Sequence, residues 1–212
     1  QKTAYEMCGR DWSSDVCSSD LLHALAAAAR ERAHAVRIGV TGSVGKTGVK
    51  EAIFLALDRA SRGAAHRSVR SYNNHVGVPL TLARMPARSR FGVFEMGMNH
   101  AGEMRVLSAH VRPHVALITT IAPAHIENLG SMEAIAAAKA EIFESLMPGG
   151  TAVIPADSPW AAQLCEAAKK YAAKVVTFGS SPDADVRLLD AIPSANGGSL
   201  VTADLEIGRA HV

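Results

Sequence analysis

A glycine-rich loop between a predicted strand and a predicted helix constrains the fold of this chain more than any other feature. The apolar run 36–40 predicts a strand, and residues 41–47 read Thr-Gly-Ser-Val-Gly-Lys-Thr. A helix with one apolar face is predicted from Lys46 to about Ala60. Glycines allow backbone amides to point at a ligand, and a helix N-terminus adds positive potential. The loop therefore predicts a phosphate site in an α/β domain.

The residue types of this loop suit a nucleotide with magnesium. Lys46 can reach the β and γ phosphates, and the Thr47 hydroxyl can hold the metal ion. The general pattern has a glycine where Val40 stands, so the loop departs from it there. The alternative is a plain Gly/Ser turn, which the strand, the Gly-Lys-Thr run and the helix disfavour. The residues predicted to bind ATP are Thr41, Gly42, Ser43, Val44, Gly45, Lys46 and Thr47.

The rest of the chain alternates between strand-like and helix-like runs. Such alternation is typical of a doubly wound, mostly parallel sheet of the P-loop type. Asp185–Ala191 and Ser199–Leu205 flank an Asn-Gly-Gly turn at 196–198, which predicts a short antiparallel strand pair near the C-terminus. Further strands are predicted at 67–70, 91–96, 115–119, 151–154 and 174–178, with helical stretches between most of them.

Composition narrows the class of protein. A chain of 212 residues with 48% apolar and 20% charged residues suits one α/β domain. A formal charge of +2 without long charged runs is not typical of proteins that bind nucleic acid or anionic membranes. The apolar run 21–29 is about half the length of a membrane span, and three cysteines without metal-ligand spacing fit a reducing compartment. We expect a cytoplasmic monomer.

Both ends of the chain resemble translated sequencing adapter rather than protein. Residues 11–21, DWSSDVCSSDL, resemble the reverse complement of a common adapter, and residues 206–212, EIGRAHV, resemble the same adapter read forward. The alternative is a natural Ser/Asp-rich leader with a natural tail. We therefore treat 1–21 as a leader and 206–212 as a tail. The domain is expected over 22–205, with an opening helix at 22–35.

Two potential metal ligands follow predicted strands. Glu95 ends the buried run 91–94, and His125 follows the strand at 115–119 after a short Ala/Pro loop. The carboxyl ends of parallel strands meet at one edge of a sheet, where ligands gather. A carboxylate there can bind magnesium, and an imidazole can serve a second metal ion. The alternative for each is a polar side chain that faces solvent.

Lys139 is predicted to lie on the apolar side of a helix. Ile135 and Phe143 stand four residues on either side of it, so the amine belongs to an apolar stripe. Burial would lower the pKa of this lysine and favour a nucleophilic amine. The alternative is a side chain whose stem packs while its ammonium group reaches water.

Four stretches of the sequence resemble the Mur ligase family. Within it, the likeness is to the branch that adds D-alanyl-D-alanine, and NNHVGVPLTL is its most discriminating stretch. Gly48 departs from the family pattern, and Pro155 stands where an asparagine that contacts adenine is common. The stretches are TGSVGKTGVKE at 41–51, NNHVGVPLTL at 73–82, FEMGMNHAGE at 94–103 and HIENLGSMEAIAAAKAEIF at 125–143.

The resemblance implies an ATP-dependent amide-bond ligase of peptidoglycan precursor synthesis. It would add D-alanyl-D-alanine to UDP-N-acetylmuramoyl-tripeptide through an acyl phosphate, with ATP and Mg²⁺. The resemblance further implies a carbamate on Lys139, formed with carbon dioxide. The residues implied as catalytic are Lys46, His125 and Lys139; as metal ligands Thr47, Glu95, His125 and Lys139; and as contacts of the peptidyl substrate Asn73 and Asn74.

Several alternatives stay open at this point. Asn73 and Asn74 also suit a tight turn, and Asn99 and His100 are reserve candidates that a helix cap explains nearly as well. A folylpolyglutamate or cyanophycin ligase shares the expected fold, and a P-loop module that only binds nucleotide would share the loop.

Full-length family members carry an N-terminal UDP-sugar domain and a closing C-terminal domain. We therefore expect this chain alone to bind nucleotide weakly and not to ligate.

Overall fold

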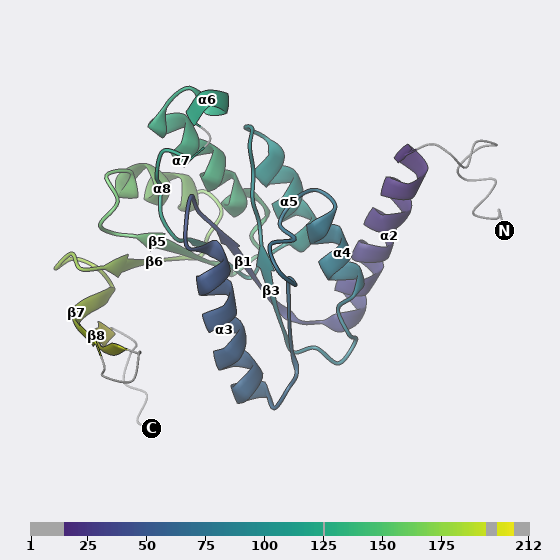
Figure 1. Ribbon diagram of the computed structural model, residues 1–212, viewed down its shortest axis with the longest axis horizontal. Helices are drawn as coiled ribbons and strands as arrows, with labels where there is room; N and C mark the ends of the chain where they lie inside the picture. The colour runs from purple at the N-terminus through teal and green to yellow at the C-terminus, as the bar shows by residue number, and fades with distance from the viewer. Residues whose placement is uncertain (1–14, 125, 194–198, 206–212) are drawn as a thin grey trace.

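A computed structural model describes residues 15–124, 126–193 and 199–205 (Figure 1). Its strands are β1 Val36–Thr41, β2 Ala65–Arg67, β3 Phe91–Glu95, β4 Val115–Ile118, β5 Thr151–Pro155, β6 Lys174–Gly179, β7 Val186–Pro193 and β8 Ser199–Leu205. Its helices are α2 Asp15–Ala33, α3 Lys46–Ser61, α4 Gly77–Ala83, α5 Glu103–Val111, α6 Ile126–Leu129, α7 Met132–Ala140 and α8 Ala161–Ala168, with a 3₁₀ turn η1 at Glu141–Ser145.

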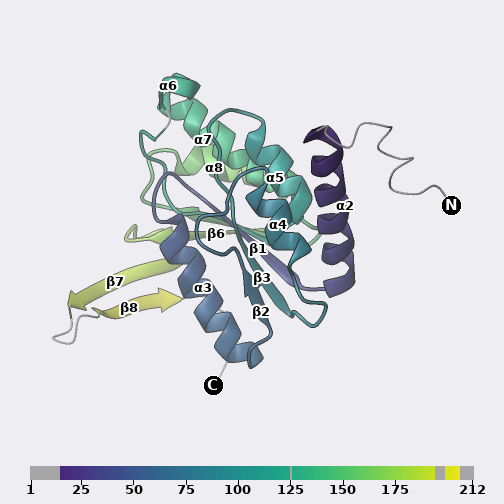
Figure 2. The ribbon, with the colours of Figure 1, turned by 45° about the vertical axis from the view of Figure 1, so that its right-hand side comes forward.

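One eight-stranded sheet organises the chain. Its order is β2-β3-β1-β4-β5-β6-β7-β8, and every neighbouring pair is parallel except β7 and β8. Figure 2 shows the β7–β8 hairpin extending away from the layered body. The predicted fold class, a mostly parallel α/β sheet with an antiparallel pair near its end, is confirmed. The Asn-Gly-Gly turn at 196–198 lies outside the described residues.

Helices cover both faces of the sheet, so its central strands are buried on two sides. On one face, Ile38, Val40 and Val93 pack against the apolar side of α3. On the other face, a larger cluster joins the sheet to α2, α4, α5, α7 and α8 (Figure 1). Alternate residues of a strand point to opposite faces, and for this reason Val93 faces α3 while Phe94 faces the larger cluster.

The strand register brings three strand ends together. Val40 is paired with Glu95 of β3, and Thr41 is paired with Ile118 of β4. The chain order reverses at β1, which lies between β3 and β4. Open parallel sheets bind ligands at such a switch point, beyond the carboxyl ends of the strands. The loop after β1 therefore begins beside the last residue of β3.

Two predicted elements differ from those observed. The strand predicted at 67–70 is β2 at Ala65–Arg67, because the Ser68 amide makes the last bond to β3, at the Val93 carbonyl, and Arg70 turns into the left-handed region with φ 52°. The opening helix begins at Asp15 rather than at residue 22. The rest of the predicted leader, and the tail at 206–212, lie outside the described residues.

No helix in the described part of the chain has both the length and the apolar character that are needed to cross a bilayer.

Candidate phosphate and metal site

Backbone geometry explains the glycines of the loop between β1 and α3. Gly42 has φ +146°, and a Cβ atom at this position would lie 1.9 Å from the Thr119 hydroxyl oxygen. Gly45 has φ +84° and stands at the N-cap of α3. Residues other than glycine rarely adopt either backbone conformation. The loop can therefore pass close to the end of β4 only with glycine at these positions.

The segment after β4 holds the loop in place. The Thr119 hydroxyl donates to the Val44 carbonyl at 2.6 Å, and the Ser43 amide donates to the Thr120 carbonyl at 2.9 Å. The Ser43 hydroxyl donates to the Ala122 carbonyl at 2.9 Å. The first amides of a helix have no acceptor within the helix. Those of α3 are thus fixed in position at an open end, where an anion can accept their hydrogen bonds.

Lys46 lies folded over the loop that precedes it. Its Nζ donates to the Gly42 carbonyl at 2.7 Å and to the Ser43 carbonyl at 3.3 Å. Burial lowers the pKa of this lysine, and the nearby Glu95 charge opposes that change. A phosphate bound at the loop would offer the ammonium group charged oxygens in place of the two carbonyls. Such charge-assisted bonds are the stronger ones.

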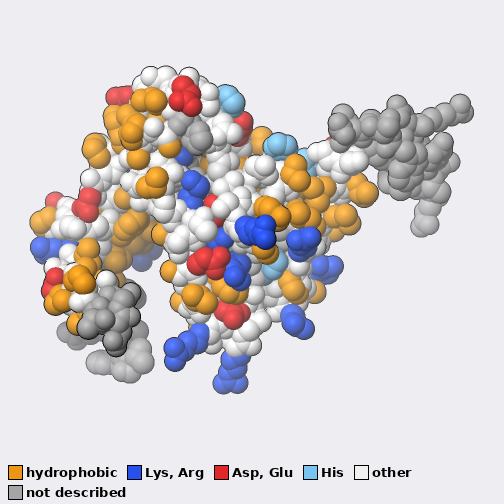
Figure 3. Space-filling view, viewed as in Figure 1, with side chains coloured by type: hydrophobic (Ala, Val, Ile, Leu, Met, Phe, Trp, Pro, Cys, Tyr) orange, Lys and Arg blue, Asp and Glu red, His pale blue; other side chains and the backbone are white. Residues whose placement is uncertain are grey.

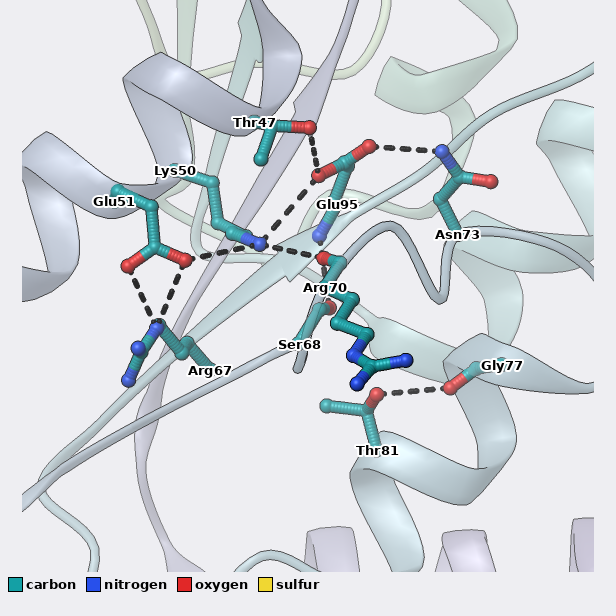
Figure 4. A network of polar contacts seen from close by, with 10 residues as sticks. All are labelled: Thr47, Lys50, Glu51, Arg67, Ser68, Arg70, Asn73, Gly77, Thr81 and Glu95. Carbon is teal, nitrogen blue, oxygen red and sulfur yellow. Dashed lines mark hydrogen bonds and ion pairs between the residues drawn. The ribbon is translucent and has the colours of Figure 1, made fainter.

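Glu95 is a buried carboxylate with partners on both of its oxygens (Figure 4). Its side chain is 1% exposed. The Thr47 hydroxyl donates to Oε2 at 2.9 Å, and the Asn73 amide donates to Oε1 at 2.8 Å. Lys50 Nζ lies 3.6 Å from Oε2, while the Glu95 backbone amide donates to the Ser68 hydroxyl at 3.1 Å. The strand-end carboxylate therefore meets the loop threonine, as the sequence predicts.

The two asparagines after β2 have different roles in the fold. Asn73 bonds to Glu95, and its carbonyl also accepts from the Gly97 amide at 2.8 Å. Asn74 Oδ1 accepts from the amides of Val76 and Gly77, at 3.2 and 2.8 Å. Asn74 thus makes the turn that leads into α4. Asn73 faces the carboxylate.

A cavity of 640 Å³ opens beside these residues. Both lysines predicted to be catalytic, Lys46 and Lys139, line it, which is consistent with one shared site. Figure 3 shows several Lys and Arg side chains, with Asp and Glu side chains among them, on the face over α3 and α4. The lining residues are Lys46, Asn73, Asn74, His75, Gly97, Met98, Asn99, Glu103, Val106, Leu107 and Lys139. His100, a reserve candidate, bonds to Glu103 through Nδ1 at 3.0 Å instead of lining the cavity.

Lys139 is buried, as the sequence predicts. Its residue is 2% exposed, on α7, whose N-cap Ser131 accepts from the Ala134 amide. Burial, together with the smaller effect of the positive charge of Lys46, lowers the pKa of Lys139 to about 8. The alternative of an ammonium group that reaches bulk water is therefore wrong. The partner predicted for a second metal ion, His125, lies outside the described residues.

The oxygen donors suit a metal ion that arrives with a nucleotide. Within the described ranges, no group of three or more His, Cys, Asp or Glu side chains could cage a metal. Magnesium is commonly held by one or two carboxylates plus substrate phosphates. The Thr47 hydroxyl and the Glu95 carboxylate provide such a partial set of hard oxygen ligands. The site therefore fits Mg²⁺ bound to phosphate, and does not fit a closed protein cage.

Three residues of the site are not predicted from the sequence. They are Thr119, which braces the loop; Ser68, which binds the Glu95 amide; and Lys50, which lies beside the Glu95 carboxylate. Of these three residues, only Lys50 has a sequence pattern that could have placed it in the site. It follows Lys46 by four residues, so it shares the face of α3 that turns toward the sheet.

Known proteins resemble this chain over most of its length. A family model described as the Mur ligase middle domain matches residues 40–212. The UDP-N-acetylmuramoyl-tripeptide–D-alanyl-D-alanine ligase of Bacillus subtilis is 37% identical over 169 residues, covering 80% of this chain and 35% of the relative. The Escherichia coli enzyme of the same name is 39% identical over 134 residues, covering 63% of this chain and 29% of the relative.

Solved structures share the fold. A crystal structure of MurF from Acinetobacter baumannii has a TM-score of 0.76 at 32% identity, over 87% of this chain and 42% of that chain. MurF ligase from Thermotoga maritima, in complex with ADP, has a TM-score of 0.75 at 26% identity, over 89% and 42%. The chain spans 35% of the Bacillus subtilis relative's length. By the match over residues 40–212, this chain belongs to the Mur ligase family and contains its middle domain.

Proposed function

We propose that this chain binds ATP at the loop 41–47 and Mg²⁺ through Thr47 and Glu95. One observation carries the proposal: the loop hydroxyl and the strand-end carboxylate are 2.9 Å apart, beside the N-terminus of α3. A metal ion seated between them would lie next to phosphates cradled by the loop amides. A relative of the same fold, MurF ligase from Thermotoga maritima, is in complex with ADP, which supports nucleotide binding.

The proposed reaction is the joining of a carboxylate to an amine at the expense of ATP. A carboxylate oxygen of the acceptor attacks the γ phosphorus, the bond to ADP breaks, and an acyl phosphate forms. Lys46 would stabilise the negative charge that develops on the phosphate oxygens. Magnesium would neutralise charge on the same phosphates. The amine then attacks the acyl carbon, phosphate leaves, and an amide remains.

The substrates are proposed from the relatives. The curated relatives join D-alanyl-D-alanine to UDP-N-acetylmuramoyl-tripeptide by name, and we propose the same pair for the protein to which this chain belongs. Asn73 and Asn74, which line the cavity, would contact the peptidyl substrate. His125 and a carbamate on Lys139 would bind a second magnesium ion. Precursors of this kind are made in the cytoplasm, where we place the protein.

Calorimetry with ADP tests the nucleotide site. The 212-residue chain, titrated with ADP in the presence of MgCl₂, should release or absorb heat with a saturable, one-site profile. Lys46→Ala should abolish this signal, because the ammonium group that pairs with the phosphates is gone. Lys169→Ala is the matched control, since that lysine, at the C-cap of α8, is 64% exposed and pairs with Glu166. Equal binding by Lys46→Ala and the control would reject the proposal.

A further inference from the structure

Lys50 is a fully buried lysine that the proposed reaction does not use. Its side chain is 0% exposed. Nζ donates to the Arg70 carbonyl at 2.7 Å, and it lies 3.2 Å from Glu51 Oε1 and 3.6 Å from Glu95 Oε2 (Figure 4). A lysine ammonium has three donors, and three oxygens surround this one. Because none of the side chain meets solvent, Lys50 acts on other residues and not directly on a ligand.

The Arg70 carbonyl belongs to the loop 68–76, which connects β2 to α4. Arg70 has φ 52°, a backbone conformation that residues other than glycine seldom adopt. The loop is tied to β3 through the Ser68 hydroxyl, which accepts from the Glu95 amide, and to the segment after β3 through the Asn73 carbonyl, which accepts from the Gly97 amide. Between these ties, the bond from Lys50 holds the left-handed residue in place.

The other side of Lys50 is fixed as well. Arg67 Nε donates to Glu51 Oε1 at 3.0 Å and forms an ion pair with Oε2 at 2.8 Å. The Arg67 guanidinium lies 4.0 Å above the Phe54 ring. Glu51 is thus held by a second cation that is itself packed on α3. This arrangement leaves the Lys50 ammonium directed at Glu95 and at the loop.

We propose that Lys50 is a positioning residue that couples the loop 68–76 to the Glu95 carboxylate. It holds the Arg70 carbonyl and Glu95 Oε2 at once, so that Asn73 reaches Oε1 from the opposite side (Figure 4). The carboxylate is then fixed in the orientation in which Oε2 meets Thr47. The effect of Lys50 on metal binding rests on the proposed function. The structural coupling between the loop 68–76 and the Glu95 carboxylate does not depend on it.

Hydrogen exchange of the ligand-free chain tests the coupling. In Lys50→Met, the amide of Gly97, which bonds to the Asn73 carbonyl, and the amides within 68–76 should exchange about tenfold to a hundredfold faster. Amides of β4 and β5 should keep their wild-type rates. Lys169→Met is the matched control and should change none of these amides. Loop rates within twofold of wild type would overturn the proposal.

A double variant separates positioning from the burial of charge. Lys50→Met leaves Glu95 without its cation, whereas Lys50→Met combined with Glu95→Gln removes both charges. The double variant still lacks the bond to Arg70, so the loop should again exchange at least about tenfold faster while the sheet stays protected. Fast exchange throughout the chain in both variants would also overturn the proposal, because Lys50 would then serve the whole fold.

Addition of ADP separates this inference from the proposed function. In wild type, ADP with Mg²⁺ should slow exchange at 41–47, and the absence of that protection would reject nucleotide binding while leaving the ligand-free result intact. In Lys50→Met, ADP alone should bind within twofold of wild type, because the loop 41–47 is unchanged. The additional affinity that Mg²⁺ confers should fall by about tenfold. Full retention of that magnesium effect would contradict positioning of Glu95.

Discussion

Val40 and Glu95 are direct partners in the parallel register of β1 and β3. Val40 stands one residue before the loop 41–47, so this pairing sets a buried carboxylate beside the glycine-rich loop that leads into α3. The relationship depends on two strands that are 55 positions apart in sequence yet adjacent in the sheet. It is the reason that the proposed phosphate site and a potential metal ligand coincide at this edge.

Glu95→Gln should separate metal binding from nucleotide binding. The amide keeps the shape of the carboxylate but removes the charge that attracts a cation. ADP without metal should bind as it does to wild type, and the gain in affinity on adding Mg²⁺ should drop by at least about tenfold. Calorimetry with and without MgCl₂ measures both quantities. Glu103→Gln is the matched control, because Glu103 lines the same cavity and its carboxylate bonds to the Asn99 amide and to His100. An unchanged magnesium effect in Glu95→Gln would exclude Glu95 as a ligand.

Lys139→Met should stabilise the chain at neutral pH. The folded pKa of Lys139 is about 8 against an ordinary value of 10.5, so below pH 8 the folded state bears the cost of a buried charge. Replacement by methionine should raise the free energy of unfolding by roughly 2–3 kcal/mol at pH 7. Between pH 8 and 10.5, Lys139 is protonated in the unfolded chain and neutral in the folded one. The free energy of unfolding of wild type therefore rises with pH, and the advantage of Lys139→Met over wild type becomes smaller.

Urea denaturation in buffer stripped of carbon dioxide measures this difference at pH 7 and at pH 9.5. Lys169→Met is the control, since that exposed lysine is not subject to a burial cost. A destabilised Lys139→Met at pH 7, or a gain that does not shrink with pH, would show that burial does not lower the pKa of this amine.

Two glycines of the phosphate loop region should respond in opposite directions to alanine. Gly42→Ala should cost roughly 1–3 kcal/mol of stability, because φ +146° is strained for alanine and the new Cβ would collide with Thr119. Gly48→Ala, in the first turn of α3, has open space around it and should gain roughly 0.5–1 kcal/mol. Thermal unfolding of both variants distinguishes them. Destabilisation by Gly48→Ala would mean that the family departure at this position has a local structural cause.

The elements of the site that are local in sequence are predicted well. The loop, the helix after it and the strand-end position of Glu95 follow from residue pattern, since strand, turn and helix each have a short-range signal. The burial of Lys139 follows from helical spacing in the same way. Such spacing indicates on which face of a helix a residue lies, and the apolar face of the helix packs against the sheet.

The elements that depend on distant partners are not predicted. Residues 67–70 have a strand-like composition, yet β2 ends at Arg67, because the Ser68 amide makes the last bond to β3 and Arg70 turns to φ 52°. The charge of Lys50 likewise suggests a surface residue, because lysines are seldom fully buried. Only the fold places three oxygens around it. Tertiary contacts decide both cases.

Carbon dioxide should react selectively with Lys139. Only a neutral amine attacks carbon dioxide, forming a C–N bond with loss of a proton. A pKa of about 8, against an ordinary value of 10.5, leaves much of the Lys139 amine neutral near pH 8. Chain equilibrated at pH 8 with ¹³C-bicarbonate should show a carbamate resonance in addition to that of the α-amino group, whose ordinary pKa is also about 8. Lys139→Met should lack this additional resonance. The signal should grow as pH rises through 8 and should increase with ADP and Mg²⁺, if the carbamate binds a metal ion beside the phosphates. A resonance of equal intensity in Lys139→Met would assign the reactive amine elsewhere in the chain.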